Sequence, residues 1–116
     1  MPSLSATRGS LIILKTEVSI SGNISSGYVF RATVGSRIFK NGGNSVNLQI
    51  TGDGGFLTSL SSCFDGFDGT INSTSSSPVY KLSRGSIGYD YSTITGTATK
   101  YNIAVNTVTS NGIIMK

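Results

Sequence analysis

Apolar and polar residues alternate along much of this chain. The pattern is clearest just before the middle, where Val46, Leu48 and Ile50 alternate with polar neighbours. A period of two residues is the repeat of a β-strand that buries one of its faces. Similar patterns predict further strands over residues 27–34, 37–40, 79–83 and 101–109, and over the second half of a long strand at residues 10–21.

An uninterrupted apolar run, Leu11–Leu14, predicts a strand segment that is buried on both faces. Turn signals separate the predicted strands, at Gly35-Ser36, at Gly52–Gly55 and at Asn111-Gly112. Short turns rich in Gly, Asn and Asp are typical of β-hairpins, whose two strands run antiparallel. The pattern therefore predicts strands that pair with their neighbours in sequence.

No stretch shows helical apolar spacing over the length that a helix needs. We therefore predict one all-β domain, an antiparallel β-sandwich or small barrel, over residues 10–116. Residues 1–9 are small and polar and end in Gly. We expect them to form an N-terminal arm that is flexible or contacts a neighbouring subunit.

The composition supports the all-β prediction. Ser, Thr and Gly make up about two fifths of the chain, whereas charged residues make up 12%. The net charge of +4 is spread over nine basic residues without a run. Scattered charge is typical of a solvated surface and does not point to nucleic acid or an anionic membrane.

Cysteine usage and the N-terminus point to one class of protein. A low-charge chain rich in Ser and Thr resembles extracellular proteins, yet Cys63 is its single cysteine and cannot form an internal disulfide. We also expect neither an export signal nor a membrane span, because the longest early apolar run has four residues. Virion proteins are made in the host cytoplasm and act outside it, so they satisfy both constraints.

The residue inventory argues against catalysis. The chain has no His, which removes Ser-His-Asp and Cys-His catalysis and most zinc and copper sites. Without a His beside it, we expect Cys63 to be a small buried core residue. We predict no catalytic residues and no cofactor.

Three of the five acidic residues, Asp53, Asp65 and Asp68, lie in the central third of the chain. Asp oxygens beside Gly turns are what Ca²⁺ sites use, so these three are candidates for a cation site. Their spacing matches no calcium-loop motif, and Asp-Gly is also a common turn dipeptide. The favoured interpretation is turns, with a metal site as the alternative.

Tyr89, Asp90 and Tyr91 form a second candidate site. Tyrosine rings could stack on sugar rings while Asp90 supplies hydrogen bonds, which suggests a carbohydrate-binding or adhesive module such as a fibre tip, a lectin or a pilus subunit. The alternative interpretation is that these tyrosines are cross-strand surface residues. The lack of Trp weakens the sugar hypothesis.

A third hypothesis is a β-barrel that binds single-stranded nucleic acid. Aromatic and basic residues interleave over residues 28–40, as they do in proteins that stack bases beside cations. The preferred interpretation is a half-buried hairpin whose aromatic side chains point inward and whose Arg and Lys side chains point outward. The candidate residues are Tyr28, Phe30, Arg31, Arg37, Phe39 and Lys40.

The leading hypothesis from the sequence is a non-enzymatic structural subunit of a virus particle. The expected setting is a bacteriophage capsid decoration, a head-to-tail component or a tail-associated protein. Its expected partners are further copies of itself and other virion structural proteins, with a host-surface glycan as an additional partner under the adhesive alternative.

Overall fold

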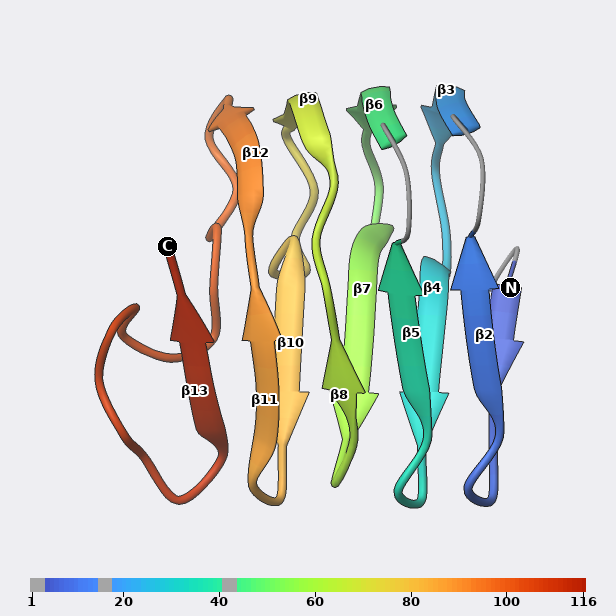
Figure 1. Cartoon of the computed structure of the whole chain (residues 1–116). Helices are drawn as coiled ribbons and strands as arrows, with labels where there is room; N and C mark the ends of the chain where they lie inside the picture. Colours follow the sequence, from blue (N-terminus) through green and yellow to red (C-terminus); the bar gives the residue numbers. More distant parts are fainter. Residues whose placement is uncertain (1–3, 15–17, 41–43) are drawn as a thin grey trace.

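The computed structural model describes residues 4–14, 18–40 and 44–116 (Figure 1). The chain winds into a β-solenoid of about four turns, in which every sheet is parallel. Each complete turn contributes one strand to each of three sheets. The strands are β1 (Leu4–Ala6), β2 (Leu11–Leu14), β3 (Val18–Ile24), β4 (Tyr28–Thr33), β5 (Arg37–Lys40), β6 (Asn44–Ile50), β7 (Gly55–Leu60), β8 (Cys63–Phe64), β9 (Asp68–Ser73), β10 (Tyr80–Ser83), β11 (Ser86–Tyr89), β12 (Tyr91–Thr95) and β13 (Gly112–Met115).

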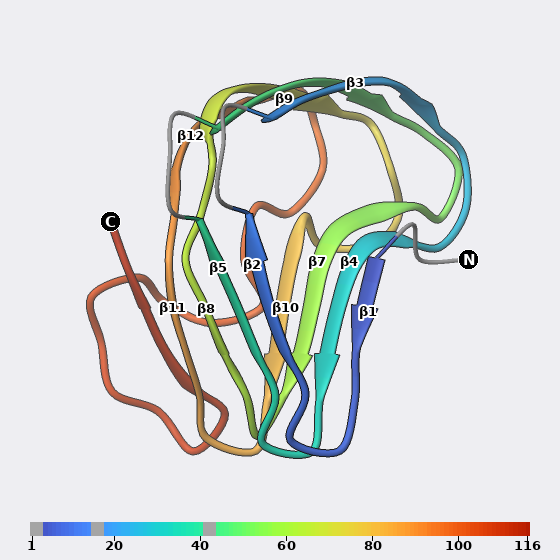
Figure 2. The same cartoon turned by 45° about the vertical axis from the view of Figure 1, so that its right-hand side comes forward.

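The three sheets stack their strands in the same order along the solenoid axis. Sheet A has the order β1-β4-β7-β10, sheet B has β2-β5-β8-β11-β13, and sheet C has β3-β6-β9-β12. In Figure 2, sheets A and B converge at one corner and sheet C closes the wide side of the wedge. Side chains inside this wedge form the core.

The prediction of an antiparallel sandwich or barrel is wrong. β4 and β5 were expected to form a hairpin, but each pairs with the equivalent strand of the neighbouring turn instead, β4 with β7 and β5 with β8. The segments on either side of Gly52–Gly55 also belong to different sheets. The turns are where the sequence placed them, but a turn fixes only a reversal of direction. It does not decide which strand becomes the hydrogen-bonding partner.

The corner between sheets A and B shows how tight turns serve a solenoid. Arg84 and Gly85 have φ of 52° and 75°, and Val34 and Gly35 have φ of 57° and 71°. Two successive residues in the left-handed region are the geometry of a type I′ turn, which glycine adopts at little cost. Here the turn joins two sheets that then diverge.

Serines line the inside of this corner on successive turns of the solenoid. Ser36, Ser62 and Ser86 are buried. The Ser36 amide donates to Oγ of Ser62 (3.2 Å), and the Ser62 amide donates to Oγ of Ser86 (3.4 Å). Each hydroxyl also donates to a carbonyl two or three residues earlier. The ladder satisfies polar groups that burial would otherwise leave without partners.

Aromatic side chains fill the wide part of the wedge. The Phe30 ring stacks on Phe67 with centroids 5.2 Å apart, and Phe56 meets both rings edge to face. Tyr80 continues the cluster toward the C-terminal end through Phe56 and Phe64. Such ring pairs contribute beyond their buried area, roughly 0.5–1.5 kcal/mol each.

The segment after β12 departs from the sequence prediction. Residues 101–109 were expected to be a strand, but they form an irregular segment whose bridges are isolated, at Tyr101 and Thr109. In this segment Ile103 and Val105 pack against the core from the end of the solenoid. Apolar and polar residues do alternate here, but the segment lies over the end of the core and is not a strand within a sheet.

Within the predicted N-terminal arm, Leu4–Ala6 forms β1 and pairs in parallel with β4. Residues 1–3 lie outside the described part. Ala6 is buried in the core.

Candidate functional site

The outer face of sheet B is the most unusual surface of the molecule. Its strands form the front layer of Figure 1. Four large apolar side chains are exposed on it, with exposed fractions of 54% for Leu11, 41% for Ile13, 44% for Ile87 and 41% for Tyr89. The remaining outward positions are Arg37, Phe39, Cys63, Asp65, Ile113 and Met115. We call these six residues, together with Leu11, Ile13, Ile87 and Tyr89, the sheet B face.

The register of sheet B arranges this face as two columns along the solenoid axis. At the start of the strands lie Leu11, Arg37, Cys63, Ile87 and Ile113, which are in register with one another. The second column lies two residues further along each strand. It consists of Ile13, Phe39, Tyr89, Met115 and Asp65, which directly follows β8 and whose N–H donates to the Ile38 carbonyl (2.9 Å).

The inward neighbours of these residues explain why the two columns point outward. Ile38, Phe64 and Ile114 are buried on the core side of the same strands. Gly88 occupies the fourth turn because a Cβ there would lie 2.1 Å from Cζ of Phe64. Strict alternation then turns the next residue in either direction outward.

The outer faces of the other two sheets are different. Sheet C presents hydroxyl and amide side chains outward, and some of them pair across turns, such as Asn72 with Gln49 (2.7 Å) and Thr95 with Asn72 (3.1 Å). Sheet A presents Arg31, Thr58 and Lys81. An apolar outer face is therefore a property of sheet B and not a requirement of the fold. Contiguous exposed apolar residues mark interaction surfaces.

Two opposite charges lie within the sheet B face. The Arg37 guanidinium lies over the Phe39 ring, 5.2 Å from its centroid. Asp65 is half-buried, and its Oδ1 is buried with no hydrogen-bond partner among the residues that the structure describes. Neither residue makes an ion pair within the described part of the chain. Arg37 is in the column at the strand starts, and Asp65 is in the column at the strand ends.

No family model matches the chain, and neither does any curated protein or solved structure.

The predicted glycan residues are divided by the structure. Tyr89 and Tyr91 are exposed by 41% and 49%, and their rings are parallel, with centroids 6.1 Å apart. Asp90 between them points inward and is 1% exposed, so it cannot reach a ligand on the surface. Desolvation first, and then the charges of Asp65, Tyr89 and Asp68, raise the pKa of the Tyr91 hydroxyl. These two carboxylates, rather than Asp90, accompany the tyrosine pair.

Asp90 is instead the centre of a buried network near the C-terminal end. Its Oδ1 accepts hydrogen bonds from the Tyr80 hydroxyl (2.9 Å) and from the amide (2.8 Å) and hydroxyl (2.6 Å) of Ser92. Its Oδ2 accepts from the Tyr101 hydroxyl and from Nζ of Lys116 at 3.2 Å. Burial first, and then the Asp90 charge, raise the pKa of Tyr80. Burial and the hydrogen bond to Asp90 raise the pKa of Tyr101.

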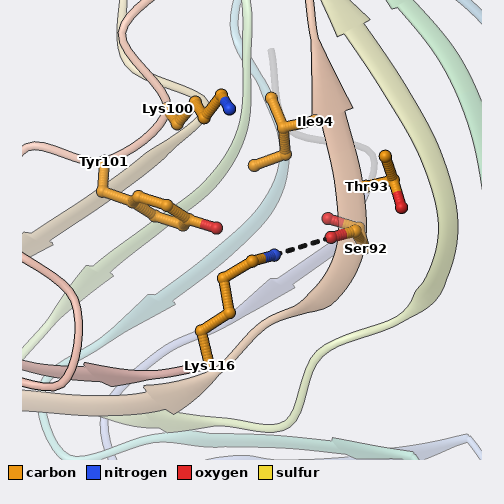
Figure 3. Close-up of a pocket in the computed structure, with 6 residues that line it drawn as sticks. All are labelled: Ser92, Thr93, Ile94, Lys100, Tyr101 and Lys116. Carbon is orange, nitrogen blue, oxygen red and sulfur yellow. Dashed lines mark hydrogen bonds between the residues drawn. The ribbon is translucent and has the colours of Figure 1, made fainter.

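A pocket of about 270 Å³ opens above this network (Figure 3). Figure 3 shows Lys116 reaching across it, where Nζ donates to the Ser92 carbonyl (2.8 Å). Two of the groups in the pocket that could do chemistry, Nζ of Lys116 and the Tyr101 hydroxyl, are bound to Asp90. The arrangement closes the last turn of the solenoid. The residues lining the pocket are Ser92, Thr93, Ile94, Lys100, Tyr101 and Lys116.

The three candidate metal ligands do not meet. Asp53 lies in the turn between β6 and β7, whereas Asp65 and Asp68 flank the turn between β8 and β9 at a different corner. Among the described residues, no three or more His, Cys, Asp or Glu side chains come close enough to hold a metal ion. Cys63, expected in the core, is half-buried on the sheet B face.

The candidate nucleic-acid residues are also separated. Phe30 is buried, Arg31 points outward from sheet A, and Arg37 and Phe39 belong to sheet B. The Tyr28 hydroxyl donates to the Pro78 carbonyl at 3.3 Å. The side chain of Lys40 lies outside the described part.

The described residues include no helix that is long and apolar enough to span a membrane.

Sequence reasoning missed the sheet B face. The run Leu11–Leu14 was interpreted as buried on both faces, but Leu11 and Ile13 are exposed. A run of four apolar residues does not show which face is covered. The available signal was the internal repeat, because the register of β2 on β5 pairs residues that lie 26 positions apart.

Proposed function

We propose that this chain is a non-enzymatic structural subunit that assembles by side-by-side contacts, and that its setting is a virus particle. The single observation that carries the proposal is the apolar outer face of sheet B on a solenoid whose other two sheets present mostly polar residues. Burying Leu11, Ile13 and Ile87 against another protein would remove apolar surface from water, at roughly 25 cal/mol per Å².

The solenoid supports a structural role. Parallel rungs are held by long-range backbone ladders, and the corner serines add hydrogen bonds between turns. A surface built on such a ladder is pre-ordered, so it loses little conformational freedom on binding. The composition, which is rich in Ser and Thr and low in charge, supports a virion setting independently of the fold. Its expected partners are further copies and other virion structural proteins.

The test compares two exposed positions on the fourth turn. Ile87 lies on the sheet B face, and Thr93 points outward from sheet C. We expect light scattering after size exclusion to give a native mass that rises with wild-type concentration. We expect Ile87→Asp to remain monomeric, because a carboxylate would be buried in the contact. Thr93→Asp is the matched control and should assemble like the wild type. Monomeric wild-type protein at every concentration would contradict the proposal, as would equal behaviour of the two variants.

A second candidate function is glycan binding, favoured by the parallel tyrosine pair beside Asp65 and Asp68. Ring faces stack on sugar C–H groups, and carboxylates accept hydrogen bonds from hydroxyls. Tyr91 separates the two functions because it lies on β12, outside the sheet B face. A glycan array should then show binding by the wild type that Tyr91→Ala loses without changing the native mass. An array with no bound glycan would end this candidate.

A further inference from the structure

We propose that the occupant of the sheet B face is a second copy of the same chain, related by a two-fold axis parallel to the solenoid axis, with Arg37 of each copy beside Asp65 of the other. The inference rests on the proposed function, because it names the partner for that surface. It is carried by the positions of the two charges within the two columns.

The strand direction limits how two such faces can meet. Two-fold contacts place a surface against its own copy. We call each strand level of sheet B a rung. If the axis is parallel to the solenoid axis, the column at the strand starts lies opposite the column at the strand ends, and each rung lies opposite the same rung of the second copy. If the axis is parallel to the strands, each column lies opposite itself with the order of the rungs reversed.

The first arrangement brings opposite charges together. Arg37 then lies opposite the second copy's Phe39 and one rung, about 4.8 Å, from the second copy's Asp65. A guanidinium can reach a carboxylate over that distance and lie on an aromatic ring at the same time. The symmetry makes this contact twice. β2, β11 and β13 place apolar side chains opposite one another, such as Ile87 opposite Tyr89, and the β8 level places Cys63 opposite Asp65.

The second arrangement brings like charges together. β8 is the central strand of the five, so reversal of the rungs places Asp65 opposite Asp65 of the second copy. Arg37 would then lie opposite Ile87, with no acidic partner. Like charges facing each other across a contact are unfavourable.

The face is narrow, with two columns over five rungs, so the contact belongs to the small end of the range for protein interfaces. We therefore expect a weak dimer at micromolar or higher concentration. In a small contact the two charge pairs form a large share of the interaction, so changing them should have a clear effect.

The experiment uses charge exchange between separate chains. Arg37→Asp alone would place two carboxylates together, and Asp65→Arg alone would place two guanidinium groups together. Each variant alone should dimerise about tenfold or more weakly than the wild type in sedimentation velocity. A mixture of the two variants forms heterodimers with both opposite-charge pairs restored, and so should regain dimers. Circular dichroism of each variant checks that it is folded.

The outcomes separate the inference from the proposed function. Recovery of dimers in the mixture supports the parallel two-fold arrangement. Wild-type self-association that neither variant weakens, or that the mixture does not restore, overturns the inference and leaves the structural role in place. Wild-type protein that stays monomeric to millimolar concentration overturns both.

Discussion

The two ends of the solenoid bury equivalent side chains to different extents. Ile12 and Ile114 both point inward from sheet B, Ile12 from the first strand of the sheet and Ile114 from the last. Ile114 is fully buried, whereas Ile12 is only partly buried. Leu14, Ile20 and Ile24 of the first turn are also only partly buried.

The difference comes from what lies beyond each end. At the C-terminal end the irregular segment after β12 folds over the core and carries Ile103 and Val105 against it. No described segment does this at the N-terminal end. In a repeat fold each turn buries its neighbour, so a terminal turn needs a capping segment. The comparison shows that this chain caps one end with its own residues.

The largest expected effect tests the comparison directly. Ile114→Ala should lower the free energy of unfolding by about 2–5 kcal/mol, the usual range for a fully buried isoleucine. Ile12→Ala should cost about half as much, because part of its side chain is already in water. Chemical denaturation of the two variants measures the difference. Ile38→Ala, a buried position in register with Ile12, should resemble Ile114→Ala. Equal losses for Ile12 and Ile114 would remove the distinction between the ends.

The second prediction concerns the network that closes the C-terminal turn. Asp90→Asn keeps the shape of the side chain but removes its negative charge. That charge pairs with Lys116, and the carboxylate oxygens accept hydrogen bonds from the hydroxyls of Tyr80 and Tyr101. We expect a loss of about 3 kcal/mol, since buried donors are left facing an amide. Asp53→Asn is the control, because Asp53 is exposed in a turn. Thermal unfolding of both variants checks the prediction, and a similar small shift in each would count against a closing role for Asp90.

Asparagine side chains end two of the sheets in place of another strand. The Asn102 amide accepts from the Leu82 N–H (2.8 Å) and donates to the Leu82 carbonyl (2.7 Å). The Asn106 amide makes the same pair of contacts with the backbone of Lys116. A primary amide carries the same donor and acceptor as a peptide group, so it can continue a backbone ladder by one step.

The third prediction removes one of these contacts. Asn102→Ala leaves both backbone groups of Leu82 without a partner, and we expect a loss of about 1–2 kcal/mol. Amide hydrogen exchange should show faster exchange at Leu82, while the central strands keep their protection. Asn102→Asp is the matched control, because a carboxylate still accepts from the Leu82 N–H. If exchange at Leu82 does not change in Asn102→Ala, the side chain does not protect this edge.

The sequence predicted most of the strands but not their partners. Alternation located strands such as that of Val46–Ile50, because alternation reports which side of one strand is buried. Pairing depends on residues far away in sequence, and the tight turns suggested neighbours. The decisive pattern was the repetition of Ala6–Ser10 at Ala32–Ser36, with a related Leu82–Ser86, which marks one corner of successive turns.

For the candidate sites too, local alternation predicted which residues are exposed but not which distant residues they contact. Tyr89 and Tyr91 were expected together on the surface, and both are exposed, although they lie on different strands, β11 and β12, because the alternation of outward and inward residues continues across the corner between them. Asp90 was misplaced, because the same alternation that exposes its neighbours turns it inward. The contacts of Asp90 with Tyr101 and Lys116 depend on the chain folding back over its end, which no local pattern encodes.

The smallest expected effect is a pH dependence at the closed end. Burial raises the pKa of Tyr80 in the folded state, while in the unfolded chain it titrates near 10. The folded state therefore holds its proton longer, and this contribution to stability is complete below pH 10 and falls as the pH rises above it. One tyrosine contributes a slope of up to about 1.4 kcal/mol per pH unit. Urea unfolding of wild type and Tyr80→Phe from pH 8 to 11 should show the shallower decline in the variant, whatever its stability at pH 8. Parallel curves for the two proteins would mean that Tyr80 does not couple the closed end to pH.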